Sequence, residues 1–315
     1  MLIQFIILIF GFTILIKGAD LLTNGASNIA KKFHIPDVII GITIVAIGTS
    51  MPELFISISS AISGSSDLAL ANAIGSNICN LLFVLGLSSI INPINMDIKN
   101  TENYICFSLF AVVLILAMGN ISSIITRTDG AILLTCFILF LIYSITLSLK
   151  DIKTTPANLS SKSTQATSLI VSVISIVIGI LLLKFGGDFV VDSSTAIAKA
   201  YNISEKVIGL TIVAVGTSLP ELATSIIARN KNNSGIAVGN IIGSNIINIF
   251  LIIGVSAIIR PINYSNVFNP NIILLIISTL AFWIFKYIGE KNTVTRSKGF
   301  LLLATYIANT IILFI

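Results

Sequence analysis

Long apolar stretches dominate the chain, and short polar segments separate them. A helix needs about 20 mainly apolar residues to cross the hydrocarbon core of a bilayer. Ten stretches come close to this length, and we expect each of them to be a membrane span. They are 2–28, 36–63, 68–91, 103–120, 129–149, 168–198, 204–228, 235–259, 270–288 and 298–315. The pattern therefore predicts an all-α polytopic membrane protein with ten transmembrane helices.

The chain also divides into two similar halves. A polar, Ser/Thr-rich segment at 150–167 separates five predicted spans from the next five. Residues of the first half recur 168 positions later, so that Glu221 stands where Glu53 does (221 − 53 = 168). Because each half has an odd number of spans, the second half enters from the opposite side of the membrane. We therefore expect two inverted five-helix repeats, 1–149 and 168–315, joined by a cytoplasmic linker at 150–167.

Each half carries one hexapeptide inside an apolar span, Gly-Thr-Ser-Met-Pro-Glu at 48–53 and Gly-Thr-Ser-Leu-Pro-Glu at 216–221. Proline lacks an N–H and its ring clashes with the carbonyl four residues earlier, so predicted helices two and seven must break there. Backbone that is not helical is accepted at membrane depth only where it is buried in protein or lines a polar cavity. The freed carbonyls, hydroxyls and glutamates form oxygen-only clusters, which suit hard cations.

A simpler interpretation is that each proline only kinks its helix and each glutamate hydrogen-bonds inside the bundle. Two copies argue against it, because broken helices in matching positions of two halves are a sequence pointer to a transporter site.

A second motif follows each hexapeptide. Asn72, Ser76 and Asn80 lie at i, i+4 and i+8, which puts three polar side chains on one stripe of an apolar helix. The second half supplies Asn240, Ser244 and Asn248 in the same pattern. A polar stripe in a membrane must face groups that can hydrogen-bond, and we expect it to line the same site. Gly75 and Gly243 are expected to let helices approach closely, and Asn77 could hold helices together.

Composition agrees with a membrane protein. The 315 residues are 55% hydrophobic and 10% charged, with a mean hydropathy of +1.04. The net charge of +5 suggests a loop bias rather than a nucleic-acid partner. With the N-terminus outside the cell membrane, the outer loops would carry Arg127, Lys199, Lys206 and Arg260. The cytoplasmic loops would carry Lys31, Lys32, Lys99, Lys150, Lys153, Lys162, Arg229, Lys231, Lys286, Lys291, Arg296 and Lys298. This bias favours an N-terminus outside.

Other polar residues suggest no further chemistry. Cys79, Cys106 and Cys136 have no spacing that indicates a zinc site or a disulfide, and His34 is the only histidine. Motifs for nucleophilic catalysis or phosphate binding are missing, so we do not expect an enzyme or a bound cofactor. Lys17 and Lys184 stand three and four residues before Asp20 and Asp188, as in ion pairs within a helix.

The two hexapeptides, each followed by a Gly-Ser-Asn-Ile-x-Asn run, resemble the alpha repeats of the sodium/calcium exchanger family within the cation/calcium antiporters. The resemblance covers nearly the whole chain. It implies a secondary antiporter that exchanges several Na⁺ ions for one Ca²⁺ ion at four midplane positions, by alternating access. It also implies that spans one and six slide against the other eight.

The same resemblance implies roles for residues that match the family motifs. Glu53 and Glu221 would ligate Ca²⁺, together with the backbone carbonyls of Thr49 and Thr217. Na⁺ would use the carbonyls of Ala46 and Ala214 and the hydroxyls of Ser76 and Ser244. The centre would be lined by Ser50, Ser218, Asn80 and Asn248.

One position departs from several relatives, which carry an aspartate where this chain has Asn248. The site then holds two carboxylates, which disfavours K⁺ co-transport. Two glutamates balance one Ca²⁺ ion, whereas three Na⁺ ions would leave one positive charge, so the exchange would be electrogenic.

Three alternatives stay open at this stage. The chain could be a proton/calcium antiporter, a potassium-dependent sodium/calcium exchanger or, more remotely, a cation channel. In each case we expect a protein that functions as a monomer in a lipid bilayer, with Ca²⁺ and Na⁺ as the transported ions of the favoured interpretation.

Overall fold

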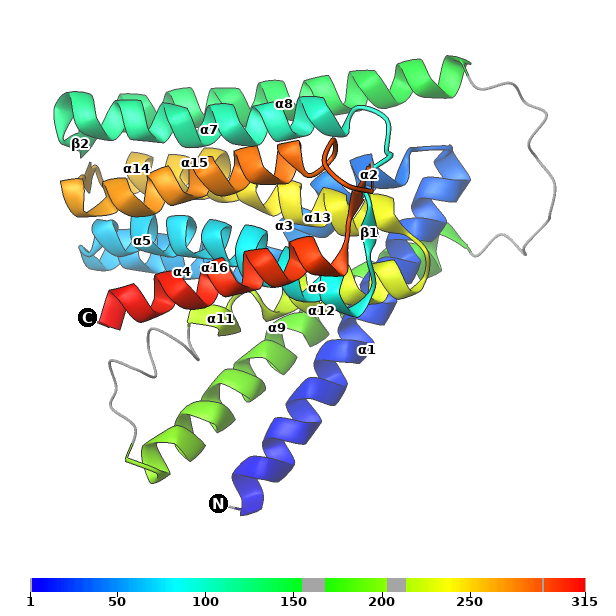
Figure 1. The fold of residues 1–315 in the computed structure, drawn as a ribbon, viewed down its shortest axis with the longest axis horizontal. Coiled ribbons are helices and arrows are strands. Elements are labelled where there is room, and N and C mark those ends of the chain that lie inside the picture. Colours follow the sequence, from blue (N-terminus) through cyan, green and yellow to red (C-terminus); the bar gives the residue numbers. More distant parts are fainter. Residues whose placement is uncertain (1, 155–167, 203–213, 291, 315) are drawn as a thin grey trace.

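The computed structural model describes residues 2–154, 168–202, 214–290 and 292–314, and this part is almost entirely helical (Figure 1). The first half contains α1 (Leu2–Phe33), α2 (Asp37–Ile40), the π-helix η1 (Gly41–Val45), α3 (Ala46–Thr49), α4 (Met51–Ser63), α5 (Ser66–Ile78), the π-helix η2 (Cys79–Val84), α6 (Leu85–Ile91), β1 (Ile94–Asn95), α7 (Thr101–Ser122), β2 (Ile124–Ile125) and α8 (Arg127–Thr154).

The second half repeats this order. It contains α9 (Leu169–Ala200), α11 (Ala214–Gly216), α12 (Leu219–Asn230), α13 (Ser234–Ile247), the π-helix η5 (Asn248–Ile253), α14 (Gly254–Ile259), β3 (Ile262–Asn263), the 3₁₀-helix η6 (Asn266–Phe268), α15 (Asn269–Ile284), β4 (Thr293–Val294) and α16 (Arg296–Phe314).

Seven described helices are long and apolar enough to cross a membrane, and the bent pair 37–49 and 51–63 would be an eighth. The chain is thus a polytopic helical membrane protein. Nine of the ten predicted spans coincide with helices, while much of 204–228 lies outside the described residues. Helix α8 continues through the polar residues 150–154 at the start of the predicted linker, and the rest of that linker, 155–167, lies outside the described part.

Two long helices stand apart from the rest. In Figure 1, α1 and α9 lie side by side and run obliquely to the stack formed by the other long helices. Their contacts show that they are antiparallel, because Gly11 of α1 meets Val190 of α9 while Gly25 meets Ser172. Large apolar side chains such as Phe5, Ile9 and Ile174 remain exposed on this pair, as expected for surfaces that face lipid.

Glycines allow the backbones of α1 and α9 to touch. Gly11, Gly18 and Gly25 recur every seven residues, and α9 presents Gly179 and Gly186 to them. A Cβ atom at Gly18 would lie 2.9 Å from the Gly179 carbonyl oxygen, so a larger residue cannot fit without separating the helices. Small residues at such intervals are typical of helix pairs in membranes, where close van der Waals packing replaces the hydrophobic effect.

The apolar core has two parts. The larger cluster lies among α5, α7, α8, α13 and α15 and includes Tyr104, Phe140 and Phe250. The smaller cluster joins the inner length of α1 to the second half through residues such as Leu22, Ala223 and Ala228. Helix α1 is therefore packed along α12 as well as along α9.

Two short antiparallel strand pairs connect the halves. Strand β1 pairs with β4, and β2 pairs with β3. Ile94 of β1 corresponds to Ile262 of β3 at the repeat offset (262 − 94 = 168), and each of them pairs with a strand from the other half. The same connection thus occurs twice, once at each pair of strands.

The close contact between α1 and α9 can be tested at two adjacent glycines. A Cβ atom at Gly186 would lie 2.7 Å from the backbone nitrogen of Leu15, whereas one at Gly187 would meet only the Gly216 carbonyl oxygen, at 3.9 Å. We expect Gly186→Ala to lower the free energy of unfolding by about 1–3 kcal/mol through overpacking. Gly187→Ala should leave it unchanged or raise it by up to about 1 kcal/mol, because alanine favours helix. Thermal unfolding in detergent measures both effects. Equal destabilisation of the two variants would contradict this packing.

Candidate functional site

Both hexapeptides break a helix at matching positions. Ser50 separates α3 from α4 and has φ −84° and ψ 7°. Thr217 and Ser218 separate α11 from α12, and Ser218 has φ −89° and ψ 4°. The first break bends the helix by 48°. The prolines stand in the first turn of α4 and α12, where the missing N–H is tolerated. The predicted break within each hexapeptide is confirmed, and both glutamates then lie in the first turn of the helices that follow.

Glu53 and Glu221 are buried, with exposed fractions of 1% and 0%. They lie near enough to repel each other electrostatically. Ser50 of the first half donates a hydrogen bond to Glu221 Oε1 at 3.1 Å, which connects one hexapeptide to the carboxylate of the other. The Thr217 side chain of the second half in turn lies beside Glu53. The two broken helices therefore meet in one site inside the protein.

The second motif lies beside the carboxylates. Ser76 donates to Glu53 Oε1 at 3.5 Å, and Ser244 donates to Glu221 Oε1 at 3.3 Å. Both bonds are long, so these hydroxyls hold the carboxylates only weakly. Of the stripe predicted from the spacing of Asn72, Ser76 and Asn80, the first two residues contact Glu53 of the hexapeptide.

The first asparagine of each motif braces the broken helix. Asn72 Nδ2 donates to the Glu53 carbonyl at 3.3 Å, and Asn240 Nδ2 donates to the Glu221 carbonyl, also at 3.3 Å. Each amide also donates to a hydroxyl four residues beyond the glutamate, Ser57 at 3.1 Å and Ser225 at 3.3 Å. These bonds place the start of α4 and of α12 against α5 and α13.

Sequence reasoning did not single out Ser57 and Ser225. The signal was present, because both positions are serine and differ by the repeat offset (225 − 57 = 168). A systematic comparison of polar residues shared by the halves would have found them.

The helices that carry the second motif touch each other through asparagines. Asn77 Nδ2 donates to the Asn245 carbonyl at 3.0 Å, and Asn248 Nδ2 donates to Asn77 Oδ1 at 3.0 Å. The expectation that Asn77 holds helices together is confirmed. Gly243 also allows a close approach, because a Cβ there would lie 2.6 Å from Ile42 Cα. Gly75 meets no described atom within 4 Å, and the segment that matches Ile42, around position 210, lies outside the described residues.

Two π-helices begin at this site. Segment η2 starts at Cys79, next to Asn80, and η5 starts at Asn248. A π-helical turn changes the direction of the side chains and is often found at functional sites. The sequence pattern did not predict these turns, because their apolar residues fit an ordinary helix equally well.

Several buried polar atoms of the site have no hydrogen-bond partner among the described residues. They are Oε2 of Glu53 and of Glu221, Oγ of Ser218, both amide atoms of Asn80 and Oδ1 of Asn248. An unpartnered buried polar atom is costly, and such an atom in a native structure calls for an explanation. Most of these atoms are oxygens that could bind a cation, which would supply the missing partner.

Other predicted ligands have partners already. The Ala46 carbonyl accepts the Ser50 N–H at 3.0 Å and the Thr49 hydroxyl at 3.3 Å. The Thr49 hydroxyl also donates to Asn240 Oδ1 at 3.0 Å. Ala214 begins α11, and nothing is described of its side chain. Of the twelve residues predicted for the site, Ala46 and Ala214 stand two positions before the hexapeptides, and the others stand within the hexapeptides or in the second motif.

The donor set indicates which ligands could bind here. It consists of carboxylate, hydroxyl, amide and carbonyl oxygens, with Cys79 as the one thiol nearby. Oxygen ligands favour hard cations, and Ca²⁺ tolerates irregular sets of six to eight oxygens better than Mg²⁺ does. Two carboxylates in a dry environment also require a positive charge close by.

Comparison with known proteins agrees with this chemistry. The family model described as sodium/calcium exchanger protein matches residues 3–146 and 171–315. The sodium/calcium exchanger MaX1 of Methanosarcina acetivorans is 30% identical, with 99% of each chain covered. The putative antiporter CaxA of Alkalimonas amylolytica is 35% identical, covering 100% of this chain and 99% of its own.

Solved structures give the same result. The structure of the sodium-calcium exchanger NCX_Mj soaked with Na⁺ and Ca²⁺ matches with a TM-score of 0.82 and 34% identity, covering 97% of each chain. Its family consists of transporters, which agrees with the expectation that the chain is not an enzyme. With both repeats matched by the family model and the whole fold matched by a structure, the chain belongs to the sodium/calcium exchanger family.

Proposed function

We propose that this protein exchanges Na⁺ for Ca²⁺ across the cell membrane by alternating access at the site between the two broken helices. The observation that carries the proposal is the pair of buried carboxylates, Glu53 and Glu221, each with an Oε2 atom that has no hydrogen-bond partner among the described residues. A fixed pair of negative charges inside a membrane protein is stable only with cations bound or with protons.

In this proposal different residues bind Ca²⁺ and Na⁺. Ca²⁺ binds between Glu53 and Glu221, with the carbonyls of Thr49 and Thr217 completing its shell. Na⁺ ions use the carbonyls of Ala46 and Ala214 and the hydroxyls of Ser76 and Ser244. The centre is lined by Ser50, Ser218, Asn80 and Asn248. The unpartnered Oδ1 of Asn248 and Oγ of Ser218 support this lining role.

The proposed architecture is ten spans in two inverted repeats, 1–149 and 168–315. Its support is the matched order of elements in the two halves and the two strand pairs that connect them reciprocally. The bias of basic residues places the N-terminus outside. Since both hexapeptides and both copies of the second motif come from one chain, the site is complete in a monomer.

The function can be tested in liposomes that contain the purified protein. We expect an imposed Na⁺ gradient to drive uptake of radioactive calcium, while a pH gradient or a K⁺ gradient alone does not. Calcium flux that follows the pH gradient and ignores Na⁺ would identify a proton/calcium antiporter. An absolute requirement for K⁺ would identify a potassium-dependent exchanger, and flux without any counter-ion would indicate a channel.

The role of the carboxylates can be tested by Glu53→Gln and Glu221→Gln. Each change should reduce sodium-driven calcium flux by about a hundredfold or more. A bound Ca²⁺ ion would lose one of the two carboxylates that neutralise it, and breaking a buried pair of opposite charges costs about 3–5 kcal/mol. Glu102→Gln is a matched control, since Glu102 pairs with Lys286 at 2.5 Å and its side chain is 42% exposed. The control should retain normal flux, and normal flux in either site variant would remove that glutamate from the ligand set.

The two-carboxylate site predicts that exchange is electrogenic. One net charge moving with each cycle is worth about 2.3 kcal/mol per 100 mV, which changes the equilibrium Ca²⁺ gradient about fiftyfold. The membrane potential can be clamped with a K⁺ ionophore while calcium flux is measured. The Ca²⁺ gradient at which the flux reverses should then shift with the imposed voltage in this proportion. A reversal point that depends only on the ion gradients would show electroneutral exchange.

A further inference from the structure

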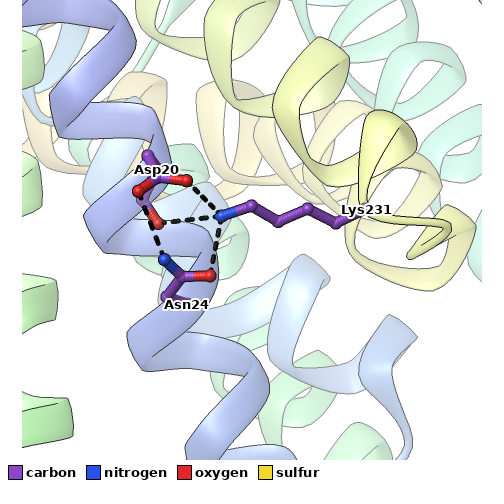
Figure 2. A network of polar contacts seen from close by, with 3 residues as sticks. All are labelled: Asp20, Asn24 and Lys231. Atoms are coloured by element: carbon purple, nitrogen blue, oxygen red, sulfur yellow. Dashed lines mark hydrogen bonds and ion pairs between the residues drawn. The ribbon is translucent and has the colours of Figure 1, made fainter.

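A stripe of polar residues on α1 is docked on the turn between α12 and α13. Asp20, Asn24 and Ser27 lie at i, i+4 and i+7, on one face of α1. Figure 2 shows Lys231 of the turn reaching the Asp20 carboxylate and backbone carbonyl and the Asn24 side chain. The Lys231 ammonium donates to Asn24 Oδ1 at 2.6 Å, and Asn24 Nδ2 donates to Asp20 Oδ2 at 3.3 Å.

The same turn has a second contact with this stripe. Asn233 Nδ2 donates to Ser27 Oγ at 2.8 Å, while its Oδ1 caps the start of α13 by accepting the Ile236 N–H at 3.1 Å. The turn at 231–233 therefore holds two successive helical turns of α1. Below it, Leu22 and Ala228 are fully buried in a common apolar cluster, so no gap separates α1 from α12 at this end.

The equivalent stripe on α9 is in a different situation. The repeat offset of 168 maps Asp20, Asn24 and Ser27 to Asp188, Asp192 and Thr195. Asp188 pairs with Lys184 of its own helix at 3.0 Å, which confirms the ion pair expected from the sequence. The Thr195 hydroxyl is buried and has no hydrogen-bond partner in the part of the chain that is described.

Two cavities lie between the polar stripe of α9 and the beginning of α4. One cavity of about 240 Å³ is lined by Asp188, Asp192, Pro52 and Thr217, and a second of about 240 Å³ lies between Leu183 and Phe55. Both lie between α9 and the first broken helix. The contact that is closed along α1 and α12 is thus open along α9 and α4.

A cation also stands at the turn that corresponds to 231–233. That turn is 63–65, where Gly64 ends α4 with φ +98°. The Arg260 guanidinium covers it, because a Cβ atom at Gly64 would lie 2.6 Å from Arg260 Nη1. Each of the two turns therefore has one basic residue, Lys231 within the first and Arg260 over the second.

From these contacts we propose that the two polar stripes dock alternately, and that Lys231 and Arg260 set the balance between the two states. The proposal rests on the alternating access proposed above. In the state of this structure the stripe of Asp20, Asn24 and Ser27 is docked on 231–233. In the opposite state the stripe of Asp188, Asp192 and Thr195 docks on 63–65 beside Arg260, while the first stripe is released.

The expected size of the effect follows from the exposure of the contact. Lys231 and Asp20 are 34% and 42% exposed, so a simple ion pair here would contribute little. Lys231, however, binds three acceptors that are all on α1. Since these bonds exist in only one of the two states, their loss changes the ratio of the states directly. We expect a change of about threefold to tenfold.

The test uses two reporter cysteines at matched positions, in a protein whose three native cysteines are replaced by alanine. Val191 lines the open cavity, and Thr23, its counterpart, is fully buried (191 − 168 = 23). In membrane vesicles, a membrane-impermeant maleimide should label Val191→Cys rapidly from one face. Thr23→Cys should react slowly and from the opposite face, because only the minor state exposes it.

Lys231→Met should raise the labelling rate of Thr23→Cys about threefold to tenfold, because it weakens the docked state. Arg260→Met should lower that rate, because it weakens the opposite state. Lys231→Met and Arg260→Met serve as controls for each other, because each removes one surface cation and the two are expected to change the labelling rate in opposite directions. Asp20→Asn should act like Lys231→Met, and the exchanged pair Asp20→Lys with Lys231→Asp should return the rate toward the original value.

The proposal would be overturned if Thr23→Cys were labelled at the same rate in the parent, in Lys231→Met and in Asp20→Asn. It would also be overturned if Lys231→Met and Arg260→Met changed the labelling rate in the same direction. Thermal unfolding of each variant in detergent identifies any that fail to fold, and Asp20→Asn replaces Lys231→Met if needed. Labelling requires no ion flux, so this result is independent of the calcium uptake assay that tests sodium/calcium exchange.

Discussion

The structure depends on keeping two carboxylates, Glu53 and Glu221, in a place where water cannot reach them. Each is buried, and they are close enough to repel each other. Within the described part of the chain, each also has one oxygen without a hydrogen-bond partner. A polar group left in this condition costs several kcal/mol, and a charged one costs more. The surrounding bonds from Ser50, Ser76 and Ser244 are too few and too long to offset that cost. A bound cation can offset it, and so can protonation of the carboxylates, which makes the site suitable for exchanging positively charged ions.

The broken helices are the means by which the carboxylates reach this position. A continuous helix would satisfy its own backbone and offer only side chains, whereas Pro52 and Pro220 interrupt the hydrogen bonds of two helices within the protein. Asn72 and Asn240 then hold the backbone at each glutamate, because each side-chain amide donates a hydrogen bond to the glutamate carbonyl. The polar residues of each half thus serve two purposes. The serines contact the carboxylates, and the first asparagines fix the helix that presents each carboxylate.

Much of this arrangement could be predicted from the sequence, because it depends on features that a single chain displays twice. The proline in an apolar span predicts each break, and the spacing of Asn72, Ser76 and Asn80 predicts the stripe beside it. Other features depend on contacts between distant segments and leave no local pattern. The π-helices at Cys79 and Asn248 arise among residues that fit an ordinary helix. The end of α8 at Thr154 was missed because polar residues can continue a helix beyond the apolar part.

The difference between the two halves is also invisible in the sequence. Asp20 and Asp188 occupy equivalent positions, yet Asp20 binds Lys231 of a distant turn and Asp188 binds Lys184 of its own helix. Nearly the same residues are thus packed in two ways within one molecule. If the two halves can exchange these environments, the protein has a second state of similar energy, in which the cavity beside α9 closes and one beside α1 opens. The glycine contact between α1 and α9 favours their moving together, because separating them would expose backbone that no side chain covers. Alternating access then requires no new fold, since each state uses packing that the other half already displays.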